Sequence, residues 1–407
     1  MRNLRLALIL AVVYVDMLGV GLAYPVLPRL VQQFQHGDVA RASYVYGLLI
    51  SAYSLTQFLF APFFGALSDR YGRRPIMIAA LVGATSAYCM MAMAHGLAVL
   101  AVSQLLAGVM GGSFATASAY LADMTPPEQR AQNFGLVGAA FGLGIITGPA
   151  IGGLLGAVDP HLPFAAAAVA SGLNVAFAFF ALPESLAPER RTPFRLRHAN
   201  PLGALRQIRR YRTIGRLLAI FALATFASRA SETVWVLYTG YRMHWGAAQI
   251  GLSIALAGVL LVIGQGWLPR VLLPRIGACH AILLGVGMSV FVYIGYGSAT
   301  QGWMLYCVMP LSLIGWPFAQ PAVQSLMSRA VPAGEQGLLQ GALASVASLT
   351  TVLGPLVWTS LFGYFVSDRA PANIPGMTFY VAALTFLAAF LLAVRWRRAE
   401  FLQPAVA

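Results

Sequence analysis

Three charged side chains lie well inside long apolar runs of the sequence: Asp16, Arg229 and Glu232. A charge at the centre of a bilayer costs roughly 2.5 to 3.5 kcal/mol on the insertion scale, and such residues mark proton relays and substrate paths. Asp16 and Glu232 are therefore candidate proton carriers, or partners of a cationic substrate group. Two plainer interpretations stay open. Asp16 could lie close to the cytoplasmic interface and be solvated, and Arg229 and Glu232, three residues apart on one helix face, could form a structural pair.

A denser group of charges separates two other apolar runs, 48–66 and 76–94. It contains Gly65, Asp69, Arg70, Gly72, Arg73 and Arg74. Each flanking run approaches the roughly 20 apolar residues that cross a bilayer, so segment 65–75 is predicted to be a tight aqueous hairpin. Gly65 and Gly72 allow close backbone approach and positive φ. Asp69 is expected near the start of the following helix, whose N-terminus favours an anion.

The arginines of this hairpin need acidic partners. Asp69 is one, and Asp123, at the end of a later apolar run, is another. If Arg70 or Arg73 reaches Asp123, the contact latches two helical hairpins at the cytoplasmic face while the protein faces outward. The alternative is a simple topological anchor of positive charge, for which neither Asp69 nor the glycines are needed.

Composition excludes a soluble protein. The 407 residues are 59% hydrophobic and only 9% charged, whereas charged residues make up about 25% of soluble domains. The net charge of +14 does not indicate nucleic-acid binding, because the arginines lie between apolar runs. Cys89, Cys279 and Cys307 have no metal or disulfide spacing. No nucleotide-binding loop or nucleophile motif is present, so we expect neither an ATP-driven pump nor an enzyme, and no cofactor or metal.

Twelve apolar runs are long enough to span a membrane as helices. They lie near 6–34, 44–66, 76–95, 97–122, 132–157, 162–182, 214–239, 248–269, 277–298, 302–328, 336–365 and 376–395. Most arginines fall on alternate loops, which by the positive-inside rule places both termini in the cytoplasm. We therefore predict an all-α membrane protein. Its parts are an N-terminal six-helix bundle over 1–182, a cytoplasmic linker over 183–213 and a C-terminal six-helix bundle over 214–407.

The two halves repeat each other. The recurring pairs are Arg70-Tyr-Gly72 with Arg275-Ile-Gly277, Pro126-Pro-Glu128-Gln129 approximately with Pro332-Ala-Gly-Glu335-Gln336, and Gly148-Pro149 with Gly354-Pro355. All three offsets are close to half the chain length. This agreement indicates two parallel repeats with a path between them near the membrane midplane, which is a transporter architecture.

The fifth span is rich in small residues. Its glycines and proline are Gly144, Gly148, Pro149, Gly152 and Gly153. Small residues permit tight helix contact, and a proline adds a kink. We expect a close-packed seam against the other half that blocks leak; ordinary small-residue packing is the alternative.

These motifs resemble those of the twelve-span drug:proton antiporters of the major facilitator superfamily, and most of all the tetracycline efflux antiporters. The matching stretches include Gly65 to Arg74, Asp16 to Pro28, Gly144 to Gly153, Val234-Trp235 and Gln336 to Gly341. The resemblance implies proton-driven export by alternating access. It also implies that Gln57, in the second span, is a polar residue of the central cavity.

Further side chains of the predicted path have two interpretations each. Gln57, Gln320 and Gln324 could bind substrate or join helices by hydrogen bonds. Trp235 and Tyr238 suit a flat hydrophobic ligand, but aromatic residues at helical spacing often only pack. Arg229 and Glu232 complete the expected substrate-binding set.

The sequence departs from the family pattern in three spans. Gln104 replaces the usual arginine of span 4, apolar residues 260–263 replace the histidine of span 8, and 282–296 lacks a carboxylate. Recognition of metal-chelated tetracycline is therefore not transferred to this chain. We expect a monomer that binds a small molecule, protons and lipid in a bacterial inner membrane. The alternatives are a transporter of a metabolite or siderophore, and a non-transporting membrane receptor or scaffold.

Overall fold

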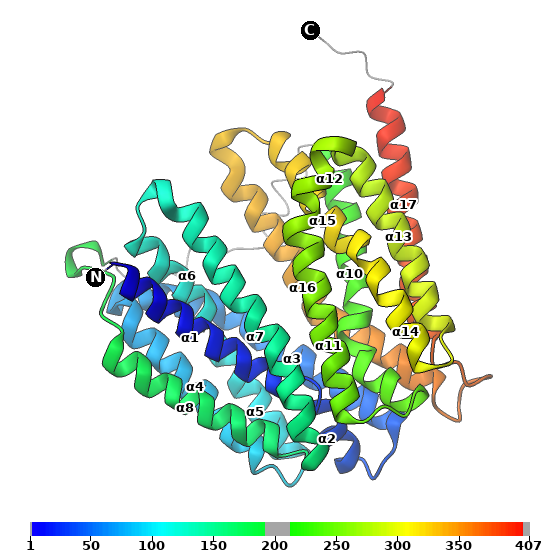
Figure 1. The fold of residues 1–407 in the computed structure, drawn as a ribbon, viewed down its shortest axis with the longest axis horizontal. Coiled ribbons are helices and arrows are strands. Elements are labelled where there is room, and N and C mark those ends of the chain that lie inside the picture. Colours follow the sequence, from blue (N-terminus) through cyan, green and yellow to red (C-terminus); the bar gives the residue numbers. More distant parts are fainter. Residues whose placement is uncertain (1, 192–211, 402–407) are drawn as a thin grey trace. The chain divides into compact units, whose positions relative to one another are not determined.

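The structure is a computed structural model, and it describes residues 2–191 and 212–401. Every regular element within those ranges is a helix (Figure 1). Twelve helical segments are long and apolar enough to cross a membrane: Leu6–Phe34, Val39–Tyr71, Arg73–Ala92, Leu97–Met124, Gln132–Val158, Leu162–Ala181, Ile214–Arg242, Ala247–Ile276, Ala278–Ser298, Gly302–Arg329, Gln336–Phe365 and Met377–Arg397. The predicted fold class is confirmed, and this chain is an integral membrane protein.

The described residues divide into two compact units, 2–191 with 245–258, and 212–244 with 259–401. Most of the predicted linker, 192–211, lies outside the described residues. The first part of span 8 belongs to the first unit in this division, whereas the sequence placed all of it in the C-terminal bundle. The predicted bundle boundaries stay a prediction.

The first unit contains eight α-helices and the beginning of a ninth. They are α1 (Arg2–Ala23), α2 (Leu27–Phe34), α3 (Val39–Tyr71), α4 (Arg73–Ala92), α5 (Leu97–Met110), α6 (Ser113–Met124), α7 (Arg130–Val158), α8 (Leu162–Ala181) and the start of α11 (Ala247–Val262). Helix α1 packs on α7 and α8 (Figure 1). Side chains of α1, α4 and α6, including Ile9, Leu81 and Tyr120, form a buried core.

The glycines of α7 bring its backbone onto α1. A β-carbon at Gly148 would lie 2.6 Å from Gly21 Cα, and one at Gly144 would lie 2.6 Å from Met17 Cβ. Gly152 faces the backbone of Leu22 in the same way. The expectation that these glycines form a seam against the other half is wrong for these three, because they pack on span 1 of their own half.

Gly153 alone among the predicted seam glycines faces span 8. A β-carbon there would lie 2.8 Å from Gly251 Cα, within the first unit. Such close approach requires two residues without side chains. The Gly153–Gly251 contact explains why the start of span 8 clusters with the first unit.

The second unit contains the remaining α-helices of the described residues. They are α10 (Arg212–Arg242), the end of α11, α12 (Leu268–Ile276), α13 (Ala278–Ser298), α14 (Gly302–Val308), α15 (Trp316–Arg329), α16 (Gln336–Phe365) and α17 (Met377–Phe401). Helix α10 packs on α16 and α17, and α13 packs on α15 and α17. Buried aromatic side chains fill the space between them, and Trp358 Nε1 donates a 2.9 Å hydrogen bond to the Phe226 carbonyl.

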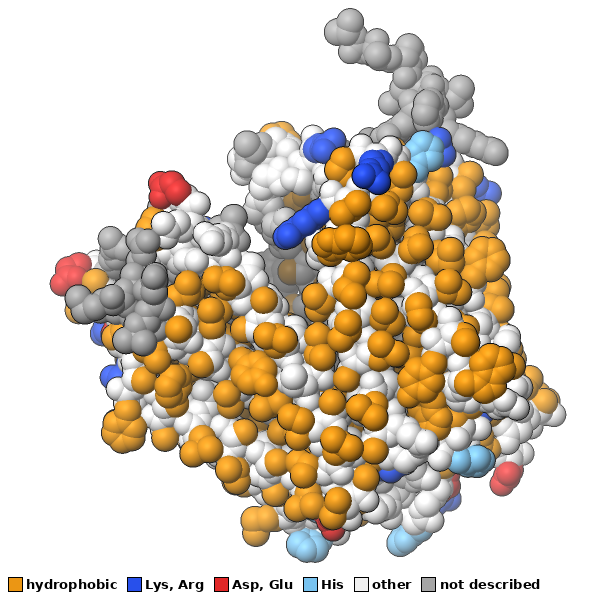
Figure 2. All heavy atoms as spheres, in the orientation of Figure 1, with side chains coloured by type: hydrophobic (Ala, Val, Ile, Leu, Met, Phe, Trp, Pro, Cys, Tyr) orange, Lys and Arg blue, Asp and Glu red, His pale blue; other side chains and the backbone are white. Residues whose placement is uncertain are grey.

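On the face shown in Figure 2, apolar side chains cover the sides of the helices, and most charged side chains lie toward the helix ends. Leu48, Leu173, Phe180 and Phe291 are each more than 60% exposed. Large exposed apolar side chains on nearly every span are expected where the surrounding solvent is lipid rather than water.

Candidate functional site

The predicted hairpin between spans 2 and 3 is almost entirely helical. Helix α3 continues to Tyr71 and α4 begins at Arg73, so Gly72 alone separates them. Asp69 therefore lies in the last turn of α3, and its expected position at the start of the next helix is wrong. Gly72 has φ +109°, but Gly65 lies within α3 and a β-carbon there would meet nothing within 4 Å. The expected role of Gly65 in close approach or positive φ is also wrong.

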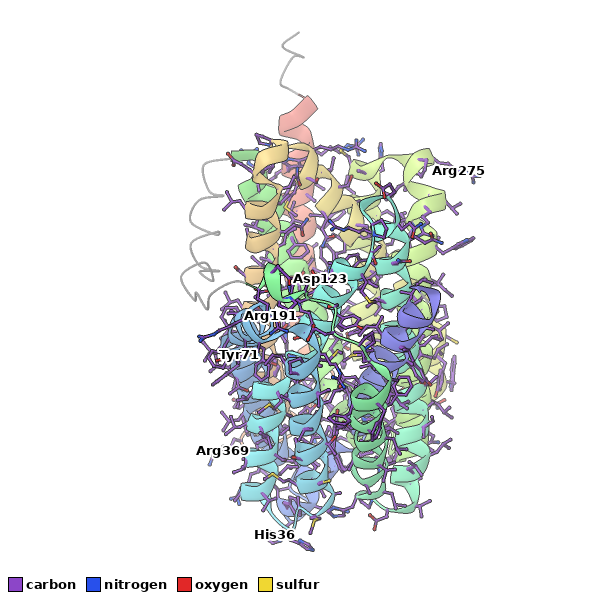
Figure 3. All side chains as sticks on the ribbon, turned by 90° about the vertical axis from the view of Figure 1, so that its left-hand side faces the viewer. His36, Tyr71, Asp123, Arg191, Arg275 and Arg369 are labelled. Atoms are coloured by element: carbon purple, nitrogen blue, oxygen red, sulfur yellow. The ribbon has the colours of Figure 1, made fainter. Side chains whose placement is uncertain are left out.

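Arg73 is the centre of a charge cluster at this end of the first unit. Its Nε donates to Asp123 Oδ2 at 3.0 Å, its Nη1 donates to Ser68 Oγ at 2.7 Å, and it forms an ion pair with Asp69. The Arg73 side chain is only 11% exposed. Figure 3 shows Asp123, Tyr71 and Arg191 at one end of this unit and His36 at the other.

Arg70 and Arg74 make different contacts. The Arg70 guanidinium lies over the Tyr71 ring at 5.1 Å. The Arg74 guanidinium lies over the Phe179 ring at 5.5 Å and donates to the Phe179 carbonyl. Of the two arginines expected to reach Asp123, it is Arg73 that does so.

Glu184 completes the cluster, and the sequence reasoning missed it. Its Oε1 accepts from Arg73 N at 2.9 Å, and its Oε2 accepts from Arg74 N at 3.3 Å. These amides begin α4, where unpaired N–H groups and the helix dipole favour an anion. Glu184 therefore fills the position that we expected Asp69 to occupy. The sequence offered one signal for it, because Glu184 is an acid that directly follows span 6 in a segment rich in arginine.

Asp16 lies inside the first unit and is 8% exposed. Its Oδ2 accepts a 2.6 Å hydrogen bond from Ser113 Oγ, at the first residue of α6. The alternative of a solvated Asp16 is wrong for this structure. Tyr53 and Tyr88, from α3 and α4, interact electrostatically with the same carboxylate.

Gln57 joins α3 to the interruption between α5 and α6. Its Nε2 donates to the Gly111 carbonyl at 3.3 Å and to Tyr53 Oη at 3.4 Å. This geometry matches the interpretation of Gln57 as a helix-joining residue, and its role in substrate binding stays a prediction. Gln104, at the position of the missing arginine, is buried in α5.

Arg229 and Glu232 form an ion pair in α10. The Glu232 side chain is 51% exposed and the Arg229 side chain 25% exposed. Helix α16, which carries the repeated Gly354-Pro355 motif, packs closely against Arg229: a β-carbon at Gly354 would lie 2.9 Å from Arg229 Cβ. The structure thus has the predicted pair, with its carboxylate half-exposed.

The other predicted substrate residues of the second unit lie in two environments. Trp235 and Tyr238 are 6% and 0% exposed; the Trp235 ring packs edge-on against Tyr296, and Tyr238 Oη donates to the Tyr296 carbonyl at 2.6 Å. Both side chains therefore pack in the core, in agreement with the second of the two interpretations that the sequence left open. Gln320 and Gln324 lie on α15, where each is partly exposed.

Gln320 has a partner that the sequence did not indicate. Its Oε1 accepts a 2.8 Å hydrogen bond from Gln265 Nε2. Gln265 lies in a π-helical turn, Ile263–Trp267, that interrupts span 8, and such turns are frequent at functional sites. The available signal was the polar Gly264-Gln265-Gly266 sequence inside an apolar span.

A family model described as Major Facilitator Superfamily matches residues 9–355. The chain belongs to the Major Facilitator Superfamily. It is 40% identical to "Tetracycline resistance protein, class C" of Escherichia coli, over 95% of this chain and 96% of that protein. It is 37% identical to "Tetracycline resistance protein, class G" of Vibrio anguillarum, over 87% and 89% of the two chains. The resemblance stated from the sequence is confirmed.

Solved structures share the fold of this superfamily member. An inward-facing, unoccupied bacterial homolog of the human lysosomal transporter Spinster has a TM-score of 0.75 at 16% identity, over 99% of both chains. The human organic anion transporter MFSD10 has a TM-score of 0.69 at 24% identity, over 96% of this chain and 99% of that chain.

Proposed function

We propose that this superfamily member is a proton-coupled secondary active exporter of a small amphipathic drug, tetracycline-like or multidrug, that works by alternating access. The observation that carries the proposal is its 40% identity, over nearly the full length of both chains, to a protein named for tetracycline resistance. Metabolite or siderophore transport and a receptor role are less favoured, because curated relatives at 34% to 40% identity are tetracycline resistance proteins.

The proton step is assigned to Asp16 and Glu232. Asp16 is buried and has a hydroxyl donor, and Glu232 is half-exposed beside Arg229. A proton that binds Glu232 removes its charge and releases the Arg229 guanidinium from the ion pair. A carboxylate that alternates between a paired and a protonated state is the element that proton-driven transport requires. Gln57, Gln320 and Gln324 supply hydrogen bonds to the substrate in this proposal.

The protein is further proposed to be a monomer without enzymatic activity in a bacterial inner membrane, with both termini in the cytoplasm. The positions of the arginines along the sequence support that orientation. A thiol reagent that does not cross the membrane tests it. In a protein whose Cys89, Cys279 and Cys307 are replaced by serine, Arg369→Cys should be labelled in intact cells and Arg70→Cys should not; the reverse pattern would invert the topology.

Proton release from vesicles containing the purified protein tests the coupling. Adding a tetracycline, with and without Mg²⁺, should cause drug-dependent proton movement in the wild type. Asp16→Asn and Glu232→Gln should abolish it while leaving expression unchanged. Asp368→Asn, which removes an exposed carboxylate outside the spans, is the control. Normal coupling in Glu232→Gln would remove Glu232 from the mechanism, and no proton movement with any drug tested would contradict the proposal.

A further inference from the structure

Helix α6 connects two of the sites described above. Its first residue, Ser113, donates to Asp16. Near its other end, Asp123 accepts from Arg73. Asp123 follows Ser113 by ten positions along the helix, a rise of about 15 Å at 1.5 Å per residue. A membrane-embedded carboxylate and the charge cluster at the end of the first unit are therefore held by opposite ends of one short helix.

The helix is separated from α5 by a defined interruption. Gly111 and Gly112 leave the helical path between Met110 and Ser113. The approach of α3 requires a glycine at Gly112, where a β-carbon would lie 2.8 Å from Phe64 Cβ; a β-carbon at Gly111 would lie 2.6 Å from Nε2, at the end of the Gln57 side chain. Gln57 also holds the Gly111 carbonyl. The interruption separates α6 from α5, which packs on α3.

The Asp16–Ser113 contact responds to charge. Hydroxyl donors bind carboxylates at about 2.5–2.7 Å, and these charge-assisted bonds are roughly twice as strong as neutral ones. The observed distance is 2.6 Å. A proton on Asp16 removes the charge and weakens the contact at the first turn of α6.

We propose that Ser113 is a positioning residue for Asp16, and that α6 transmits the protonation state of Asp16 to the Asp123–Arg73 contact. This inference rests on the proposed role of Asp16 as a proton carrier. When Asp16 is ionised, Ser113 holds α6 in the position that keeps Asp123 on Arg73. When Asp16 is protonated, α6 is released and the Asp123–Arg73 contact opens.

Other ionisable groups lie near the two ends of α6, and an experiment must distinguish their titration from that of Asp16. Tyr53 and Tyr88 interact with Asp16; in α7 and α8, which pack on α1, the one ionisable side chain is Arg130. Arg130 lies at the start of α7, and its Nε donates to the Thr125 carbonyl. At the other end of α6, the neighbouring charges are Asp69, Arg73, Arg74 and Glu184. Titration of these groups could move the cluster without Asp16, so an Asp16→Asn control is required.

A spin-label distance measurement tests the proposal without any substrate. The native cysteines, Cys89, Cys279 and Cys307, are replaced by serine, and labels are attached through Tyr71→Cys on α3 and Met124→Cys on α6. In the parent protein, the distance between the labels should increase on going from alkaline to acid pH. Asp16→Asn should abolish this shift.

Substitutions of Ser113 test whether its hydroxyl is needed for the pH-dependent change in distance. Ser113→Ala should abolish the pH-dependent shift, and Ser113→Thr, which keeps the hydroxyl, should retain it. In vesicles, Ser113→Ala should lower drug-coupled proton flux about tenfold, the size expected for one hydrogen bond to a charged group. A full shift in Ser113→Ala, or a shift that persists in Asp16→Asn, would overturn the proposal. Because the distance needs no drug, a pH shift that depends on Ser113 in a protein that moves no drug would contradict only the proposed function.

Discussion

The Glu184 carboxylate lies directly against Gly72, so that a β-carbon at residue 72 would be 2.9 Å from Glu184 Cδ. The glycine thus has two functions. It adopts a backbone conformation, φ +109°, that residues with side chains rarely adopt, and it leaves space for the acid that binds the first amides of α4. This contact joins the end of span 6 to the junction between spans 2 and 3.

Gly72→Ala should destabilise the protein by about 1 to 3 kcal/mol, the cost of a residue in a sparsely populated backbone region. Gly65→Ala is the matched control, since Gly65 is helical and a β-carbon there meets nothing within 4 Å. It should be neutral or stabilising by up to about 1 kcal/mol, from helix propensity. Thermal unfolding in detergent measures both. Equal melting temperatures for the two variants would show that the Gly72 conformation is not required.

Glu184→Ala should lower stability by about 1 to 2 kcal/mol, because it removes the acceptor of the first amides of α4. Glu184→Gln should cost less, since one side-chain oxygen remains to accept from Arg73 N. Glu189→Ala, which removes an exposed acid in the same segment, should have no effect. Melting temperatures in detergent check the order. An Ala variant as stable as the wild type would refute the capping role.

Arg73→Lys should slow transport at least about tenfold, because an ammonium cannot reproduce the planar, multi-donor geometry of the guanidinium. Arg73 contacts Asp123, Ser68 and Asp69 together. Arg70→Lys should have a much smaller effect, since Arg70 lies over the Tyr71 ring instead. Initial rates of drug uptake into everted vesicles, normalised to protein amount, make the comparison. Equal rates for the two variants would contradict a special role for Arg73.

Gly148→Ala should destabilise the contact between α1 and α7 by about 1 to 3 kcal/mol, the usual cost of overpacking. The added methyl group would meet the Gly21 backbone, which has no flexible side chain to move aside. Gly138→Ala on the same helix adds its methyl group where nothing lies within 4 Å, so it should be neutral. Thermal unfolding and yield of folded protein distinguish them. A stable Gly148→Ala protein would mean that α1 and α7 can separate at little cost.

Hydropathy alone was sufficient to locate the spans. The predicted run 302–328 is Gly302–Arg329 in the structure, and the predicted run 336–365 is Gln336–Phe365. Each helix satisfies its own backbone hydrogen bonds, so in lipid its position depends chiefly on its own residue types. The charged cluster was also evident, and Asp123 was predicted as an arginine partner from its position at the end of a later apolar run.

The sequence was less informative about which side chains meet. Glu184 is 111 residues from Arg73, and Ser113 is 97 residues from Asp16. Nothing in the residue types near Ser113 distinguishes a carboxylate donor from an ordinary helix-packing serine. The same applies to the glycines of α7, which the sequence assigned to a seam between halves and which mostly pack on α1.

By itself, the sequence determined the membrane environment, the number of spans, the superfamily motifs and the identity of the ionisable residues, because these depend on local composition and spacing. Tertiary structure decided that Arg73 rather than Arg70 holds Asp123, that Glu184 rather than Asp69 lies at the start of α4, and that α6 connects Asp16 to the charge cluster. These contacts depend on how the helices of one unit pack around each other, and no pattern along a single helix specifies its neighbour.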